Sequence, residues 1–392
     1  MRVGHGMARL AVIPGEPMGG YADRAGGVEG EIEPLEIHAL AVDDRFVLVV
    51  ADLACVNTDL VEAIRADLGV EACWVAATHT HAGPEPGCRP GGDVTPPGLA
   101  ERLADAARSA VEAALRDGVP ATIASAGRIW VDGVGGRRSA AATEPQVVPI
   151  DTVVVRDGAG QLLGLLVIQP VHPTVLTAAN RRTSADLAGA IRRAVAERVS
   201  GDAWVMVATG AAGDISTRHT RRGRDEAELD RLGAVIADAI TVDSPAEPLE
   251  LVRGPVAASL VLAPKNADDL PGLAGLRPAG RDRTFEQGLE LATSLLAAPA
   301  VEHRIWLEAV SVGGVDLVAV PGELFLGLGD RIRADARRPE QTVVIGYANG
   351  YLGYLPTGEA FCEPDYEVLV SPVRRGSGEQ VAQAAAALTN RL

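Results

Sequence analysis

The sequence has few aromatic residues and no long apolar run, and each shortage excludes a class of protein. Aromatic residues make up 3% of the 392 residues, so a hydrophobic content of 47% must form its core mainly from Val, Leu, Ile and Ala. No stretch approaches the roughly 20 apolar residues that cross a bilayer. We therefore expect a globular protein without stable membrane insertion.

Cysteine is also scarce. Cys55, Cys73, Cys88 and Cys362 show no C-x-x-C spacing, which indicates neither a zinc knuckle nor a disulfide framework. The amino terminus opens with glycine and histidine, where a signal peptide would place an apolar run. These observations predict a cytoplasmic protein.

Positive charge is the third shortage. The chain has 36 Lys and Arg against 52 Asp and Glu, which gives a formal net charge of −16. This balance excludes electrostatically driven binding to nucleic acid or to anionic membranes, and it is typical of a well-solvated surface. Composition leaves the oligomeric state unknown.

One pattern of strand, helix, strand and polar loop occurs three times. In each unit the strands are β-branched and apolar, and helix-capping residues such as Asn57 precede the helix. The predicted strand, helix and strand cover about 46–50, 58–68 and 73–77, then 162–168, 184–199 and 203–208, then 315–320, 324–337 and 342–346. This is the pattern of a βαβ crossover. We predict an α/β fold with mixed, largely parallel sheets, flanked by helices and with extra β-hairpins.

The remaining segments complete this prediction. Helices are expected at about 99–116, 224–240, 285–297 and 378–390, and hairpin strands at about 121–131, 251–262 and 303–313. Residues 1–35, rich in Gly and Pro, are expected to form a loop over other structure or to line a pocket, and 264–284 a surface excursion. No linker of convincing length divides the chain, so we predict a single domain over 1–392.

Potential ligands follow the carboxyl ends of these strands, where α/β sheets bind their ligands. His79 and His81 follow the first unit, and in an extended segment their side chains point the same way. His172 and Glu323 follow strands of the other two units. Two histidines and a glutamate are a known zinc set that leaves a position for an activated water. Tyr354 would complete the shell or bind a developing oxyanion.

These residues belong to motifs that resemble the neutral/alkaline (non-lysosomal) ceramidase family of zinc-dependent amidases. The motifs occur in the family's order over about 1–375. They are Thr78-His79-Thr80-His81-Ala82-Gly83-Pro84, a weaker Gly136-Arg137-Arg138-Ser139, Val171-His172-Pro173-Thr174, Gly213-Asp214-Ile215-Ser216, Val320-Pro321-Gly322-Glu323, and Tyr354-Leu355-Pro356-Thr357 followed by Tyr366-Glu367.

The resemblance implies a role for each matched residue. The implied zinc ligands are His79, His172, Glu323 and Tyr354. His81 would act as general acid/base or oxyanion partner, and Arg138 and Tyr366 would stabilise the substrate carbonyl as it becomes tetrahedral. Ser216 would act as nucleophile or hold the substrate.

Several alternatives stay open. His81 could bond only to backbone, Ser216 could cap a turn or helix, and Asp214 is expected to shape its loop. Arg137 could replace Arg138, and Tyr351 could replace Tyr354. The other histidines, which have no partner pattern, are expected to be structural or exposed: His5, His38, His219 and His303.

The chain also departs from the family. Family members that act on ceramide are usually secreted or membrane-associated and carry a carboxyl-terminal β-sandwich domain, whereas we expect only the catalytic domain here. Thr217-Arg218 stands where the family usually has Pro-Asn, and few aromatic residues are present to line a lipid channel. We predict a zinc-dependent amidohydrolase that cleaves a linear N-acyl amide, ceramide-like or smaller and soluble, by attack of metal-bound water. The alternatives are acyl transfer or another biosynthetic reaction at the same site, and a non-catalytic metal-binding protein.

Overall fold

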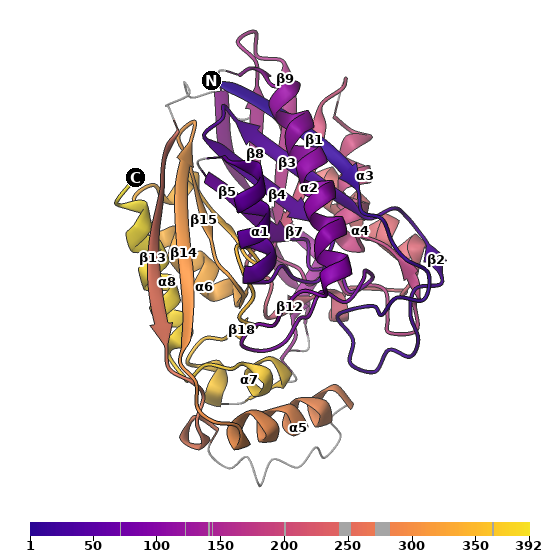
Figure 1. The fold of residues 1–392 in the computed structure, drawn as a ribbon, viewed down its shortest axis with the longest axis vertical. Coiled ribbons are helices and arrows are strands. Elements are labelled where there is room, and N and C mark those ends of the chain that lie inside the picture. Colours follow the sequence, from indigo (N-terminus) through magenta and orange to yellow (C-terminus); the bar gives the residue numbers. More distant parts are fainter. Residues whose placement is uncertain are drawn as a thin grey trace.

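Three mixed sheets with helices packed around them form the molecule (Figure 1). The computed structural model describes residues 1–70, 72–121, 123–139, 142, 144–199, 201–242, 252–270, 283–362 and 364–392. Most of the predicted excursion at 264–284 therefore lies outside the described residues. Among the described helices, none is long and apolar enough to cross a membrane.

The three sheets share one plan, in which an antiparallel hairpin is extended by a parallel strand. The first has the order β5(Ala72–Ala77), β4(Phe46–Ala51), β3(Glu36–Val42), β1(Arg2–Arg9), β6(Val119–Pro120). The second has the order β11(Trp204–Thr209), β9(Leu162–Gln169), β8(Gln146–Arg156), β7(Ile123–Arg137), β12(Ile215–Ser216). The third has the order β13(Arg253–Leu262), β14(His303–Val312), β15(Val315–Ala319), β17(Thr342–Ile345).

The three predicted βαβ units are present, and the α/β class is confirmed. Each supplies the parallel pair of its sheet: β4 and β5 through α1(Thr58–Leu68), β9 and β11 through α3(Leu187–Ala196), β15 and β17 through α6(Leu326–Asp335). The other described pairs within these sheets are antiparallel, so the sheets are more mixed than predicted. The remaining described α-helices are α2(Pro97–Arg116), α4(Glu226–Ala239), α5(Arg283–Ala297), α7(Tyr366–Val370) and α8(Ser377–Thr389).

The amino-terminal residues depart from the predicted loop. Residues 2–9 form β1, which pairs with β3 and packs beneath α2. Gly4 and Gly6 permit this packing, because a Cβ at these positions would lie 1.8 Å from the carbonyl oxygen of Ala114 and 2.0 Å from that of Ala110. The glycines that suggested a loop are thus places where a helix backbone approaches a strand closely.

An apolar core fills the space between the sheets. Its buried residues come from all three sheets and are mostly Val, Leu, Ile and Ala, as the composition predicts. Phe46 and Trp74 are the large aromatic members, and their rings meet edge to face.

The parallel strands of the three units converge at their carboxyl ends. The Ala77 amide donates to the Tyr347 carbonyl at 3.1 Å, and the Gly346 amide donates to the Thr209 carbonyl at 3.0 Å. Thr209 Oγ1 donates to the Thr78 carbonyl at 2.8 Å, which joins the first unit to the second. The loops that follow the three units therefore meet at one place. Helices α5 and α7 lie at this end of the molecule in Figure 1.

Candidate metal centre

Two imidazoles from different units face each other where the strands converge. His79 follows β5 and His172 follows β9, and their Nε2 atoms lie 2.9 Å apart. On the other side of each ring, Nδ1 donates to a backbone carbonyl, at 2.6 Å to Ala54 and at 2.9 Å to Ala212. Because carbonyl oxygens only accept hydrogen bonds, Nδ1 carries the proton in each ring and the contact fixes the ring's orientation.

This arrangement fits a bound metal ion. A ring protonated at Nδ1 turns its Nε2 lone pair toward the centre, and two such lone pairs at 2.9 Å repel each other. Burial, followed by the charges of Arg138 and the neighbouring imidazoles, holds the pKa of His172 well below its ordinary value, so this ring is neutral. A metal ion removes the repulsion and uses both lone pairs.

Glu323 supplies a carboxylate to the same centre. Its Oε2 lies 3.3 Å from His79 Nε2 and 3.4 Å from His172 Nε2, and its Oε1 accepts a 2.5 Å hydrogen bond from the Tyr351 hydroxyl. Burial would raise the pKa of Glu323, but His79, Tyr351 and Arg138 outweigh burial and lower it. The carboxyl group is therefore ionised and can act as a metal ligand.

His81 lies beside this pair. Its Nε2 is 3.3 Å from His79 Nε2, and the ligand atoms of His79, His81 and His172 lie within 4.8 Å of one another, close enough to hold a metal ion. The extended geometry predicted for 79–81 is wrong, because β5 ends at Ala77 and His79 has a φ of 64°. A left-handed conformation is costly for a non-glycine residue and is common at functional sites.

The amino-terminal segment covers the outer side of His81. A Cβ at Gly20 would lie 2.3 Å from His81 Cγ, and the Tyr21 ring meets the His81 ring edge-on with centroids 4.8 Å apart. His81 Nδ1 is buried without a hydrogen-bond partner among the described residues. The alternative in which His81 bonds only to backbone therefore does not describe this ring. Burial, followed by the neighbouring His79 and the charge of Arg138, holds the pKa of His81 well below its ordinary value. The amino-terminal stretch therefore packs against the metal centre at these residues.

Arg138 reaches the cluster from the end of β7. Its Nε pairs with Glu367 Oε1 at 2.7 Å, and its Nη1 donates to His172 Nε2 at 3.0 Å and to the Tyr354 hydroxyl at 3.1 Å. Arg137, the alternative, is an exposed side chain that points elsewhere, with its closest carboxylate 3.9 Å away. Of the two arginines, the structure brings Arg138 to the cluster.

Tyr354 and Tyr366 lie on the same side of the cluster as Arg138. The pairing of β16(Glu323–Leu324) with β18(Tyr354–Leu355) sets Glu323 beside Tyr354, whose hydroxyl lies 3.4 Å from His172 Nε2. The Tyr366 ring meets the Tyr354 ring edge-on with centroids 6.3 Å apart. Burial raises the pKa of Tyr366 to about 12 and that of Tyr354 well above its ordinary value, so both hydroxyls remain donors at neutral pH.

Ser216 stands next to His172 through the backbone. It pairs with Gly136 in β7 and forms a parallel bridge with His172. Its Oγ accepts a 3.3 Å hydrogen bond from the Arg218 amide, which caps the short helical turn at 217–219. Asp214 Oδ1 accepts a 2.7 Å hydrogen bond from the Leu326 amide at the start of α6, as expected for a residue that shapes its loop.

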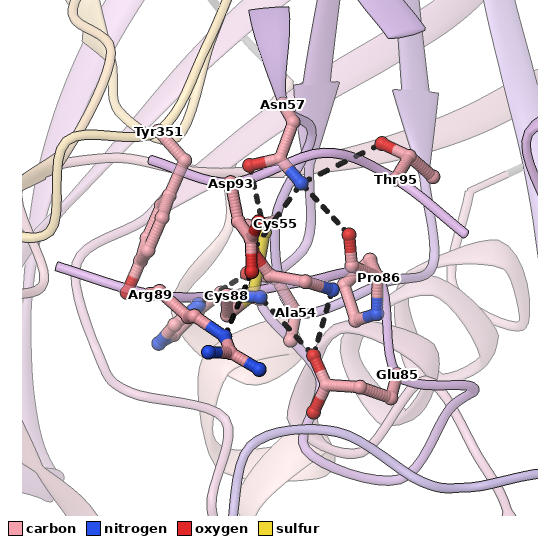
Figure 2. Close-up of a disulfide and its surroundings, with 12 residues drawn as sticks. Ala54, Cys55, Asn57, Glu85, Pro86, Cys88, Arg89, Asp93, Thr95 and Tyr351 are labelled. Carbon is pink, nitrogen blue, oxygen red and sulfur yellow. Dashed lines mark hydrogen bonds and ion pairs between the residues drawn. A yellow bond between two sulfur atoms is a disulfide. The ribbon is translucent and has the colours of Figure 1, made fainter. Parts of the chain in front are cut away.

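A disulfide lies directly behind His79, contrary to the expectation drawn from cysteine spacing. Cys55 and Cys88 are bonded, and Cys55 follows the residue whose carbonyl orients His79 (Figure 2). Asn57, expected to cap α1, instead donates to the Pro86 carbonyl at 2.8 Å and ties the same two loops together. Cysteines 33 residues apart carry no sequence signal of pairing, because only the fold brings these loops together.

Some functional side chains were missed by sequence reasoning. Tyr347 stacks on the His79 ring at 4.2 Å, and its hydroxyl donates to Glu323 Oε2 at 3.5 Å. Its position in the loop after β17, among other predicted site residues, is the signal that could have identified it. Glu367 pairs with Arg138 and stands next to Tyr366 in the motif, but a carboxylate there did not by itself indicate a partner.

Comparison with known proteins identifies the fold. No family model and no curated protein matches this chain. Two solved structures are similar to it: a ceramidase complexed with C2 (18% identity, TM-score 0.72) and neutral ceramidase from Pseudomonas aeruginosa (19% identity, TM-score 0.73). Each likeness covers 100% of this chain and 75% of the other. The chain therefore has the fold of these ceramidase structures along its whole length.

Proposed function

We propose that this protein is a zinc-dependent amidohydrolase of the neutral ceramidase family that cleaves a linear N-acyl amide, ceramide-like or smaller and soluble. The observation that carries the proposal is the pair of imidazoles, His79 and His172, whose Nδ1 atoms are tied to carbonyls and whose Nε2 atoms face each other beside Glu323. The fold shared with ceramidase structures supports amide chemistry at this centre. We take residues 1–392 as one catalytic domain.

The proposed zinc ligands are His79, His172, Glu323 and Tyr354. When bound, zinc supplies a water of lowered pKa and polarises the amide carbonyl. Tyr351 and Tyr347 hold Glu323 by their hydroxyls, so we assign Tyr351 to the support of the carboxylate and keep Tyr354 as the ligand.

The other residues act on the substrate. Arg138 and the protonated Tyr366 hydroxyl donate hydrogen bonds to the carbonyl oxygen as negative charge develops on it. His81 is neutral, so it accepts a proton beside the metal and returns it to the leaving amine. Ser216 holds the substrate beside His172 rather than attacking it, because its hydroxyl already caps a turn.

Metal analysis combined with an N-acyl amide screen tests this proposal. The wild-type protein should hold zinc and release fatty acid, whereas His79→Ala and His172→Ala should each lose the metal and activity. His303→Ala, a half-buried histidine on β14, is the control that should keep both. Stoichiometric zinc retained by the double variant, measured by elemental analysis, would refute the ligand assignment.

The cytoplasmic location remains a prediction. The Cys55–Cys88 disulfide opposes it, because disulfides persist mainly in oxidising compartments. Thiol alkylation of the protein in intact cells, followed by mass spectrometry of the two peptides, decides between the compartments: alkylated cysteines support the cytoplasm, and a bonded pair opposes it.

A further inference from the structure

A basic segment follows Ser216 directly. Residues 217–224, which we call the arginine segment, carry four arginines and no acidic residue in a chain whose formal net charge is −16. Its arginines are Arg218, Arg221, Arg222 and Arg224.

These arginines form no ion pair with a carboxylate of the described residues, whereas other arginines, such as Arg192 and Arg337, do. Arg192 pairs with Asp52 at 2.8 Å and Arg337 with Asp316 at 2.7 Å, whereas no carboxylate of the described residues lies within 4.0 Å of the arginine segment's side-chain nitrogens. Burial, followed by the charges of Arg224 and Arg218, lowers the pKa of Arg221, and Tyr21 and Asp186 act on it in the opposite direction.

Two of these side chains reach back to the loops that carry the metal centre. Arg218 Nη1 donates to the carbonyl of Arg138 at 3.0 Å. Arg221 Nη1 donates to the carbonyl of Thr174, two residues after His172, also at 3.0 Å. Arg218 and Arg221 thus place positive charge beside the loops that carry Arg138 and His172.

The charge of Arg221 also reaches the opposite wall of the site. Together with Arg24 and Arg138, it acts on the phenol of Tyr21, whose ring meets His81 edge-on. Arg24 lies over the Tyr21 ring, with its guanidinium carbon 5.0 Å from the ring centroid. Arginines from three segments of the chain therefore act on the tyrosine that packs against His81.

We propose that the substrate carries an oxyanion, a carboxylate or a phosphate, and that Arg218 and Arg221 receive this group. The inference rests on the proposed amidohydrolase function and names its substrate class. Guanidinium groups match the geometry of carboxylate and phosphate oxygens and are more weakly hydrated than ammonium groups. Only eight residues of a strongly acidic chain are involved, which favours an anion on one substrate molecule over an anionic membrane surface.

Matched pairs of short, soluble substrates test this inference. N-Octanoylglycine is compared with N-octanoylglycinamide, and N-octanoyl-O-phosphoethanolamine with N-octanoylethanolamine, with octanoate release as the measurement. We expect kcat/KM to be about tenfold or more higher for the anionic member of at least one pair, with the two pairs separating carboxylate from phosphate. The advantage should shrink as NaCl is raised, because ions screen the arginines.

Variants locate the effect. Arg218→Gln and Arg221→Gln should each reduce the ratio of anionic to neutral kcat/KM by about tenfold, mainly through KM of the anionic substrate. Arg304→Gln, an exposed arginine on β14, is the matched control that should keep the ratio. A variant that does not fold is recognised by its circular dichroism, and the salt dependence of the wild type then carries the test.

The outcomes separate this inference from the proposed function. Equal kcat/KM within both pairs, or a preference that survives in the Arg218→Gln/Arg221→Gln double variant, overturns the inference and leaves the amidase intact. If none of the four substrates releases octanoate, the proposed function fails. Calorimetric binding of N-octanoylglycine to chelator-treated protein then decides the inference by itself, because loss of that binding in the double variant supports it and unchanged binding overturns it.

Discussion

The two flanks of the metal centre are held in opposite ways. Behind His79, the Ala54 carbonyl is fixed by a covalent link, the Cys55–Cys88 disulfide (Figure 2). On the other side, Arg138 is held by Glu367 at the start of α7. The far end of that helix is held by Lys265, the single lysine of the sequence.

The difference predicts what can loosen each flank. The flank behind His79, which we call the disulfide flank, is closed by a covalent bond and by the Gly87 and Cys88 amides, which donate to Glu85 Oε1 at 2.7 and 3.1 Å, so it should respond to reductant. The flank built from Arg138, Glu367 and Lys265, which we call the charged flank, should respond to pH and to loss of a charge and be indifferent to reductant. Variants on each side therefore act as probes of one support at a time.

The largest effect is expected on the charged flank from Glu367→Ala. Arg138 and Glu367 form an ion pair in which both side chains are nearly buried, and removal of one partner leaves a buried charge uncompensated. We expect a loss of about 3 to 5 kcal/mol in the free energy of unfolding, measured with urea, and loss of turnover. Glu359→Ala, an exposed carboxylate before α7, is the control. A loss below about 1 kcal/mol would mean that Glu367 does not hold Arg138.

A smaller effect is expected on the disulfide flank from Cys88→Ser. The bond closes a loop between cysteines 33 residues apart, for which its removal costs about 3.7 kcal/mol. Release of the Ala54 carbonyl should also lower zinc affinity about tenfold, since partners of metal-bound histidines affect affinity by this amount. Competition with a chromophoric chelator measures the affinity.

The controls for this variant separate stability from ligand orientation. Cys362→Ser removes an exposed free thiol and should change neither the free energy of unfolding nor the zinc affinity. Reduced wild-type protein should behave like Cys88→Ser. Zinc affinity unchanged in a destabilised Cys88→Ser protein would show that the disulfide does not support His79.

The metal-centre residues could be found from sequence because each follows an apolar strand. Strand periodicity placed His79 after the first unit and His172 and Glu323 after the first strands of the other two, and the carboxyl ends of such strands meet in a predictable way. The same reasoning gave the described α-helices other than α7 to within a few residues, because they are strongly patterned, and it missed the five-residue α7.

The groups that hold the metal-centre residues in place could not be found from the sequence in this way. Any residue type at position 54 offers a carbonyl, so nothing in the sequence marks Ala54 as the partner of His79. Lys265 lies about a hundred residues from the carbonyls that it holds, and only the folded chain brings them together. Likewise β1 was missed because its glycines serve the packing of α2, which no local pattern reveals.

The smallest effect concerns Lys265 and pH. Its Nζ donates to the carbonyls of Val368 and Leu369, both at 2.6 Å, at the carboxyl end of α7. Burial lowers the pKa of Lys265 to about 7, against an ordinary value of 10.5 in the unfolded chain. Between these values the unfolded chain binds the proton and the folded protein does not, so stability rises with pH across this window and levels off below about 7, where both states are protonated.

The comparison of wild type with Lys265→Met isolates this contribution. From pH 7 to 9 the free energy of unfolding of the wild type should rise by about 2 kcal/mol relative to the variant, as urea titrations can measure. Cys88→Ser should keep the wild-type pH dependence, because it leaves Lys265 and its two carbonyl partners in place. If the free energies of unfolding of Lys265→Met and of the wild type change in parallel with pH, burial does not lower the pKa of the Lys265 amine. If Cys88→Ser also loses the pH dependence, the two flanks are coupled and are not separate supports.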